Sequence, residues 1–347
     1  MSFSFGFCVD DEGKQVSDEI YLATQNATRV GKDQQLPARE LNFEDVRARM
    51  PEKLSYSPLR VPHMSETSGD VVLMRRDLFD VRFQIMHDED TFADAGSDLI
   101  PGVYEGGLKT WECALDLVAV LNRIRKTLCD HDASWPVGRH LVELGCGTAI
   151  PSCYIFSSIF QTPAKDKIET PTVLSLCDYN EEVLSLVVFP NLFLAWYFSE
   201  AGPGKGLVKE PGDLEVDSEL VAQFEQALAE RSIHLRFFSG GWDSLQLETR
   251  ADVVLSSETV YSLTNLHSLC RVLQSTCWPT SQENAKTGVD RKTTLCLVAA
   301  KVLYFGVGGG IDAFLHELEH SQAWHVKQHE QVSGVGRVVL QIGWAPE

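Results

Sequence analysis

The chain has 347 residues, of which 44% are hydrophobic, and this is enough to fill the core of one large α/β domain with an extension. Its formal net charge of -19 at pH 7 repels nucleic acid phosphates, so no direct nucleic acid binding is expected. The sequence has no run near the ~20 consecutive apolar residues that span a bilayer and no signal-peptide pattern at its start, so we expect no membrane association.

The N-terminal region is polar and acidic. Residues 1–70 contain scattered Pro and Gly and no sustained apolar period, which is typical of flexible segments. Between Leu78 and Met86 apolar and polar residues alternate, which is the period of a half-buried strand. We therefore predict a largely flexible acidic extension over residues 1–70, followed by a segment over residues 71–100 that docks it onto the main domain.

Strand and helix patterns alternate through residues 101–347. Strands are predicted at His140–Gly145, Val173–Asp178, Leu235–Gly240, Asp252–Ser257 and Thr294–Lys301, and helices at Thr110–Cys129, Ile150–Phe160, Glu181–Phe198, Ser218–Arg231, Asn265–Cys277 and Ile311–Ser321. This alternation predicts a mostly parallel sheet. The last two strand-like runs, His325–Val332 and Arg337–Trp344, predict an antiparallel hairpin. The Gly- and Pro-rich stretch Glu200–Asp217 is predicted to be a surface loop.

A glycine turn follows the first of these strands and precedes a helix. Glycine permits tight turning and close approach of the backbone to a ligand, and the next helix offers free N–H donors at its start. A dinucleotide fingerprint needs a third small residue three positions after Gly147, where Ile150 stands. The pattern Glu143-x-Gly145-x-Gly147 instead suits S-adenosylmethionine, whose cationic end Glu143 can face. An ordinary strand-to-helix turn is the alternative.

Three further strands end in residues suited to a ligand. The second ends at Asp178, and nucleotide-binding α/β folds place a carboxylate at this point that accepts hydrogen bonds from ribose hydroxyls. The third ends at Gly240–Trp242, where small residues admit an adenine and the indole offers an aromatic wall. The fourth ends at Ser257–Tyr261, at the mouth where open α/β sheets bind ligands. A solvated turn at Asp178 and core packing at the other two ends are the structural alternatives.

Four segments in order resemble the histidine protein methyltransferases: Val103–Cys113, Glu143–Gly147, Ser257–Tyr261 and Lys301–Gly310. A chance match to all four is far rarer than a match to one short motif. The resemblance implies an α/β, class I (Rossmann-like) methyltransferase domain over residues 101–347, with a seven-stranded, mostly parallel sheet and a C-terminal antiparallel hairpin.

The resemblance also implies an activity. The enzyme would transfer a methyl group from S-adenosylmethionine, leaving S-adenosylhomocysteine, to a histidine of a basic large-subunit ribosomal protein in the cytoplasm and nucleus. The residues expected around the cofactor, from motifs and resemblance together, are Thr110, Trp111, Glu112, Cys113, Glu143, Gly145, Gly147, Asp178, Tyr179, Gly240, Gly241, Trp242 and Ser257.

Glu258 and Tyr261 are the candidate catalytic residues. An imidazole with a pKa of about 6.5 is mostly neutral at pH 7, whereas a lysine with a pKa of about 10.4 must first lose a proton. A histidine acceptor therefore needs an orienting hydrogen-bond partner more than a strong base, and these two residues could supply one. Packing at the strand end is the alternative role. A protein-lysine methyltransferase of the same fold and a catalytically silent adaptor are the alternative functions.

No metal is assigned. The segment His316–His320 matches the HExxH pattern of zinc proteases, but the apolar stripe of its helix places both histidines on the opposite, solvated side. The nine cysteines contain no CxxC pair, which argues against structural zinc and favours a reducing compartment without disulfides.

Overall fold

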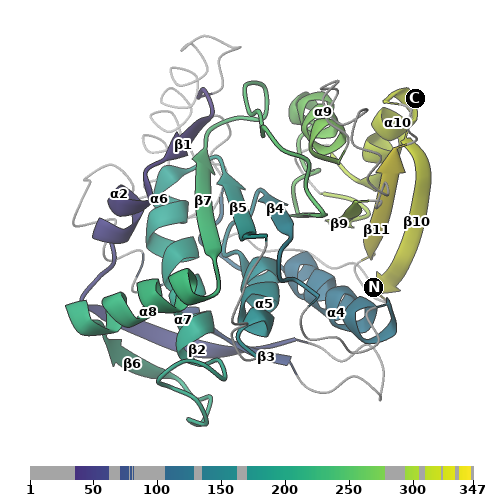
Figure 1. Ribbon diagram of the computed structural model, residues 1–347. Coiled ribbons are helices and arrows are strands. Elements are labelled where there is room, and N and C mark those ends of the chain that lie inside the picture. The colour runs from purple at the N-terminus through teal and green to yellow at the C-terminus, as the bar shows by residue number, and fades with distance from the viewer. Residues whose placement is uncertain are drawn as a thin grey trace, which may run out of the picture. The chain divides into compact units, whose positions relative to one another are not determined.

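The computed structural model describes residues 36–61, 71–77, 79, 81, 106–128, 135–161, 170–277, 294–304, 309–321, 323–332 and 336–344. The elements below lie in one compact unit, Pro37–Glu347 (Figure 1). Its strands are β1 (Arg39–Leu41), β2 (Lys53–Val61), β3 (Val71–Arg76), β4 (His140–Leu144), β5 (Thr172–Asp178), β6 (Gly212–Glu215), β7 (Ile233–Ser239), β8 (Val253–Ser257), β9 (Leu295–Lys301), β10 (Ala323–Val332) and β11 (Arg337–Trp344). Its helices are α2 (Phe43–Ala48), α4 (Glu112–Leu128), α5 (Ile150–Ile159), α6 (Glu181–Val183), α7 (Phe189–Tyr197), α8 (Ser218–Glu230), α9 (Leu266–Cys277) and α10 (Ile311–His320), with a π-helix at Leu184–Val188 and a 3-10 turn at Leu263–Asn265.

An eight-stranded sheet has the order β1-β7-β5-β4-β8-β9-β11-β10. Strands β7, β5, β4, β8 and β9 are parallel, and β11 and β10 form an antiparallel hairpin against β9. This confirms the predicted Rossmann-like methyltransferase fold, and the eighth strand, β1, is added antiparallel to the edge strand β7. The chain moves outward from β4 to β5 and β7, then returns to β8 on the other side of β4. Open α/β sheets bind ligands at such a reversal, beyond the carboxyl ends of the strands.

Helices cover both faces of this sheet (Figure 1), and a hydrophobic cluster lies on each face. Alternate residues of a strand point to opposite faces. Thus Leu141 of β4 belongs to the cluster that includes residues of α4, α5, α7 and α8, while its neighbour Val142 belongs to the cluster with residues of α9 and α10. The strands are apolar on both sides because both sides are buried, as expected of parallel strands.

A second sheet, of order β3-β2-β6, corrects two expectations. Residues 1–70 were expected to be largely flexible, but residues 39–61 form β1, α2 and β2. The stretch Glu200–Asp217 was expected to be a loop, but β6 within it pairs with β2. Polar residues interrupt both β2 and β6, and most of their residues are partly or fully exposed, so the sequence shows no long apolar run. Leu54 is nevertheless fully buried, which anchors β2 to the main core.

The predicted strand at Leu78–Met86 is wrong at its two described residues. Phe79 and Val81 are helical, and the Val81 N–H donates to the Asp77 carbonyl, a bond of one helical turn. The other residues of that strand lie outside the described ranges. The alternation of apolar and polar residues over Leu78–Met86 therefore did not distinguish a strand from a helical turn at these two residues.

The predicted helix Glu181–Phe198 is interrupted. It runs as α6, a π-helix and α7, and Pro190 stands at the start of α7. Proline has no N–H and cannot close the usual bond to the carbonyl four residues earlier, that of Leu186. The guanidinium of Arg76 on β3 donates to this carbonyl at 2.6 Å. The second sheet is thereby fastened to the helix that follows β5.

Candidate active site

The glycine turn after β4 is closely packed. Gly145 has φ of +64°, which L side chains rarely adopt, and a Cβ built there would lie 2.4 Å from Cγ2 of Thr259 and 3.6 Å from Cζ2 of Trp242. A Cβ on Gly147 would lie 3.4 Å from Cα of Gly107. Gly145 is therefore needed for the close approach of the end of β8, whereas at Gly147 the left-handed φ of +50° is what favours glycine.

Asp178 holds the same turn from the end of β5. Its buried carboxylate accepts from the Gly147 N–H at 2.8 Å and from the Asn180 N–H at 3.1 Å. The Asn180 amide donates to the Gly106 carbonyl at 2.9 Å. The structure thus brings Asp178, the residue predicted to bind the ribose, into contact with the glycine turn. Its contact with a ribose stays a prediction.

The end of β7 lies beside the end of β5 in the large sheet. The Gly240 N–H is shared between the carbonyls of Asp178 and Tyr179 at 3.1 and 3.2 Å. A Cβ on Gly240 would lie 2.5 Å from the Pro37 carbonyl oxygen. The close approach at this glycine is therefore made by the N-terminal segment, and an approach by adenine stays a prediction. Gly241 is buried beside it.

Glu143 lies beneath the turn and is buried. Its Oε2 accepts from the Ser152 N–H at 2.9 Å and from the Ser152 hydroxyl, whereas Oε1 has no hydrogen-bond partner among the described residues. Burial raises the pKa of Glu143 to about 8, although the bonds from Ser152 act in the opposite direction. Its expected contact with the cationic end of a cofactor stays a prediction.

The predicted residues at the start of α4 meet the end of β9. Lys301 lies 3.3 Å from the Glu112 carboxylate and 4.7 Å from the centre of the Trp111 ring. Thr110 Oγ1 lies 2.9 Å from the hydroxyl of Thr148 in the glycine turn. Cys113 is fully buried, and burial raises the pKa of its thiol.

Glu258 belongs to the same cluster, just beyond Ser257 at the end of β8. Its Oε1 accepts from the Cys113 N–H at 3.4 Å and lies 3.6 Å from Lys301 Nζ. Its φ of +59° is left-handed, a conformation that costs a residue other than glycine about 1–3 kcal/mol and gathers at functional sites. Burial would lower the pKa of Lys301, but the carboxylates of Glu258 and Glu112 raise it.

Tyr261 contacts this cluster through a neighbour. Its ring packs edge-on against Tyr304 with centroids 6.4 Å apart. The Tyr304 hydroxyl accepts from the Lys301 N–H at 3.2 Å, and burial, with the Glu258 carboxylate, raises the pKa of this phenol. Sequence reasoning gave no role to Lys301 or Tyr304, although both lie in a segment that carried the resemblance.

Arg75 was also missed. It lies on β3, in the segment expected only to dock the extension, and its Nη1 donates to Thr110 Oγ1 at 3.2 Å. No local pattern connects residue 75 with residue 110, because the contact depends on how the small sheet packs.

The HExxH histidines lie on the exposed side of α10, as their periodicity predicted. The rings of His316 and His320 are stacked 4.4 Å apart, and His320 Nδ1 lies 2.7 Å from the His316 carbonyl oxygen. Within the described ranges, no three His, Cys, Asp or Glu side chains are grouped to hold a metal ion, and no helix there is long and apolar enough to cross a membrane.

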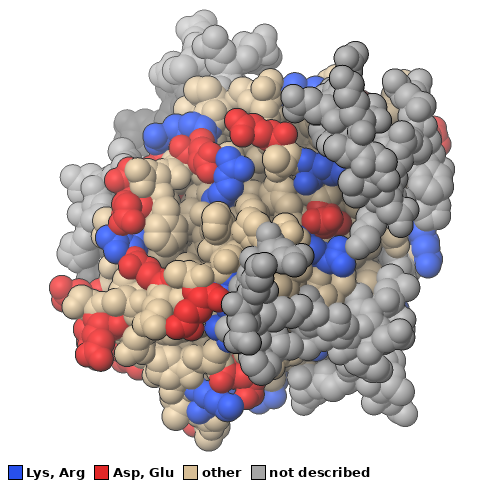
Figure 2. Space-filling view, viewed as in Figure 1, with Lys and Arg blue, Asp and Glu red and all other residues tan. Residues whose placement is uncertain are grey.

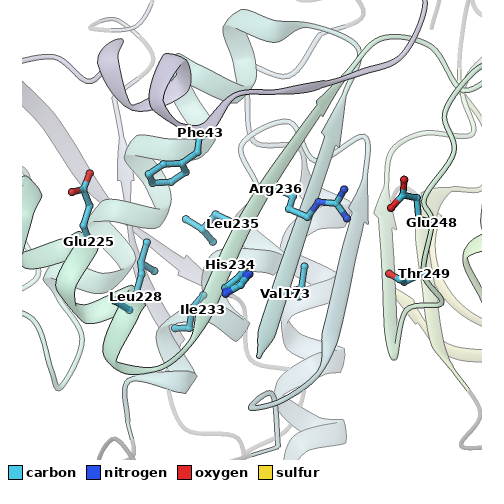
Figure 3. A pocket seen from close by; sticks show the side chains of 11 residues that line it. Phe43, Val173, Glu225, Leu228, Ile233, His234, Leu235, Arg236, Glu248 and Thr249 are labelled. Atoms are coloured by element: carbon cyan, nitrogen blue, oxygen red, sulfur yellow. The ribbon is translucent and has the colours of Figure 1, made fainter. Parts of the chain in front are cut away.

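A cavity of about 740 Å³ lies beside β7 (Figure 3). Figure 3 shows its lining drawn from α2, α8, β7 and the segment at Glu248 and Thr249. Ile233 and His234 on its floor are the first residues of β7. The cavity therefore lies at the amino ends of the strands, away from the cluster around Glu258.

We compared the sequence of this chain with those of known proteins. No family model matches the chain. A histidine protein methyltransferase of Schizosaccharomyces pombe is 35% identical over 91% of this chain and 85% of its own. That of Saccharomyces cerevisiae is 29% identical over 99% and 98%, and a homolog from Bos taurus is 29% identical over 71% and 57%.

Likeness to solved structures is much weaker. A SAM-dependent methyltransferase from Aquifex aeolicus aligns with 66% of this chain and 97% of its own, at 8% identity and a TM-score of 0.29, which is too low to add to the assignment. The similarity to the S. pombe protein extends over nearly the whole chain and confirms the predicted resemblance: the chain belongs to the histidine protein methyltransferases.

Proposed function

We propose that this protein transfers a methyl group from S-adenosylmethionine to the imidazole of a histidine in a protein substrate. The observation that carries the proposal is the cluster at the reversal of strand order, where Thr259 packs on the glycine turn after β4 and the preceding Glu258 pairs with Lys301. A cofactor site and a set of polar side chains for an acceptor thus lie at one edge of the sheet. The names of the relatives support histidine as the acceptor.

The residues present suit S-adenosylmethionine. Gly145 packs directly against Thr259, so the turn beyond β4 consists of backbone without a side chain at this position. Asp178 is positioned to accept hydrogen bonds at the end of β5, and Glu143 has a buried oxygen without a partner among the described residues. Trp242 lies against the turn, where its indole ring would form one side of the cofactor site. When bound, the cofactor supplies an electrophilic methyl carbon.

The residues of this chain would then orient the acceptor. Methyl transfer is an in-line displacement, so holding the nucleophile in place is the main requirement. Lys301 Nζ lies 3.6 Å from the Glu258 carboxylate and forms an ion pair with it at the edge of the cluster. The Glu258 carboxylate can accept a hydrogen bond from one imidazole N–H and leave the other nitrogen free to attack. The aromatic rings of Trp111, Tyr261 and Tyr304 border the cluster and limit its access to water.

For the substrate we propose a basic large-subunit ribosomal protein, acted on in the cytoplasm and nucleus. The net charge of -19 supports a basic polypeptide partner and disfavours RNA. Figure 2 shows acidic residues gathered at the lower left, where Figure 1 places α8 and β6. Such a surface would attract a basic protein over a Debye length of about 8 Å near physiological salt.

Mass spectrometry of the product tests this function. Purified protein is incubated with labelled S-adenosylmethionine and isolated large-subunit proteins, and modified peptides are sequenced. Label on a histidine of a basic ribosomal protein supports the proposal. Label on lysine would favour the lysine-modifying alternative, and failure to bind the cofactor in calorimetry would favour a silent adaptor.

Replacing Glu258 with Gln is expected to lower kcat by about 10²–10³-fold, since the amide cannot hold the imidazole as an anion does. The dissociation constant for S-adenosylmethionine should change little. Steady-state kinetics and calorimetry measure the two effects, with Glu248→Gln, an exposed carboxylate beside the cavity at the other end of the sheet, as control. A lower melting temperature with an unchanged kcat would show that Glu258 merely holds the start of α4.

A further inference from the structure

Arg75 brings a positive charge to the glycine turn from outside the large sheet. Its guanidinium donates to Thr110 Oγ1, and that oxygen lies 2.9 Å from Thr148 Oγ1. Thr148 directly follows Gly147 in the turn and is buried. The cation therefore lies at the junction of the glycine turn and the start of α4, two segments that carry predicted cofactor residues.

The strand that carries Arg75 is fixed to the same turn by a second path. The backbone N–H of Arg76 donates to the Asn191 side-chain oxygen at 2.8 Å, and the Asn191 amide donates to the Thr148 carbonyl at 2.8 Å. Asn191 is fully buried on α7. Because Arg75 and Arg76 are neighbours, two hydrogen-bonded connections join β3 to Thr148, one through Thr110 and one through Asn191.

The charge of Arg75 is not neutralised within the described part of the chain. No ion pair joins it to a described carboxylate. Burial lowers its pKa from the ordinary value, which Asp77 offsets only in part through space. In a protein with 49 acidic residues against 30 basic ones, a half-buried guanidinium without a carboxylate is a costly arrangement. An anionic group of a ligand would compensate it.

We propose that Arg75 binds the carboxylate of the methionine portion of S-adenosylmethionine. This rests on the proposed function. A guanidinium offers paired N–H donors that match a carboxylate in geometry and charge, and the hydroxyls of Thr110 and Thr148 stand beside it. The three-stranded sheet then has a role in binding, because it carries a cofactor ligand into a site otherwise built from the large sheet and α4.

Calorimetry with two ligands tests the proposal. S-adenosylhomocysteine keeps the carboxylate, and its decarboxylated analogue keeps the amine and loses only that group. Wild-type protein should bind the first about 10–100-fold more tightly, the range for a charged hydrogen bond. Arg75→Met should weaken S-adenosylhomocysteine by a similar factor and leave the analogue unchanged. Arg75→Lys should recover part of the loss.

The control is Arg60→Met, an exposed arginine on the adjacent strand β2, which should bind both ligands as the wild type does. If Arg75→Met weakens both ligands equally, Arg75 only supports the start of α4 and the proposal fails. Unchanged binding of S-adenosylhomocysteine in both Arg75 variants would also overturn it. If the wild type binds neither ligand, the proposed function itself fails, a result distinct from the other two.

Discussion

Gly145→Ala is expected to lower the free energy of unfolding by about 2–5 kcal/mol and to abolish binding of S-adenosylmethionine. The positive φ costs an alanine about 1–2 kcal/mol, and overpacking adds about 1–3 kcal/mol because the new Cβ would meet Thr259 Cγ2 at 2.4 Å. Relief of this contact would push the ends of β4 and β8 apart, and both border the proposed site. Urea unfolding and calorimetry measure the two effects.

Two variants separate strain from collision. Gly206 has φ of +76° with nothing within 4 Å of its Cβ position, so Gly206→Ala should show the cost of φ alone. Adding Thr259→Ser to Gly145→Ala removes the colliding methyl and keeps the hydroxyl, which lies 2.7 Å from Ser256 Oγ. This double variant should regain most of the overpacking cost. If Gly145→Ala proves as mild as Gly206→Ala, close packing is not the reason for glycine here.

The large sheet could be predicted because its signals are local. Each parallel strand is an apolar run with a turn at its end, as at Leu141–Leu144 before Gly145, and both faces are buried. The position of Asp178 beside the glycine turn could be predicted because the carboxyl ends of parallel strands meet at one edge of a sheet, and its carboxylate accepts from the Gly147 N–H. Both inferences need only the order of elements along the chain.

The second sheet and its contribution could not be predicted in the same way. Strand β6 has four residues and pairs with β2, more than 150 positions earlier in the chain, so no window of sequence contains both. Arg75 lies on β3, which pairs with β2, and its contact with Thr110 also joins residues 35 positions apart in the chain. The position of Lys301 between Glu112 and Glu258 likewise follows from the packing of α4 on β9.

Glu143 shows a different limit. The sequence placed a carboxylate before the glycine turn, and the alternation of strand residues makes it face the helices α4 and α5. What the sequence could not show is how completely its carboxyl is enclosed, with Ser152 at the start of α5 as its hydrogen-bond donor. Enclosure changes the protonation state, and this gives the group an effect on stability that depends on pH.

Stability should therefore fall as pH rises because of Glu143. Its pKa is raised from 4.5 to about 8, so the folded state binds a proton that the unfolded state has already lost between these values. The stabilisation is complete below pH 4.5, declines as pH rises, and is lost by the time pH passes about 8. The full difference corresponds to roughly 5 kcal/mol between the two protonation states.

Glu143→Gln removes this dependence, since an amide of the same shape does not titrate. The free energy of unfolding of the wild type should fall relative to that of the variant as pH rises. Between pH 5 and pH 9 this relative loss should amount to several kcal/mol. Urea unfolding at five pH values measures it, and Glu219→Gln, at an exposed carboxyl on α8, should show no such trend. If the difference between wild type and Glu143→Gln stayed constant from pH 5 to 9, the buried carboxyl would be ionised over this whole range. Its Oε1, which has no partner among the described residues, would then carry no proton.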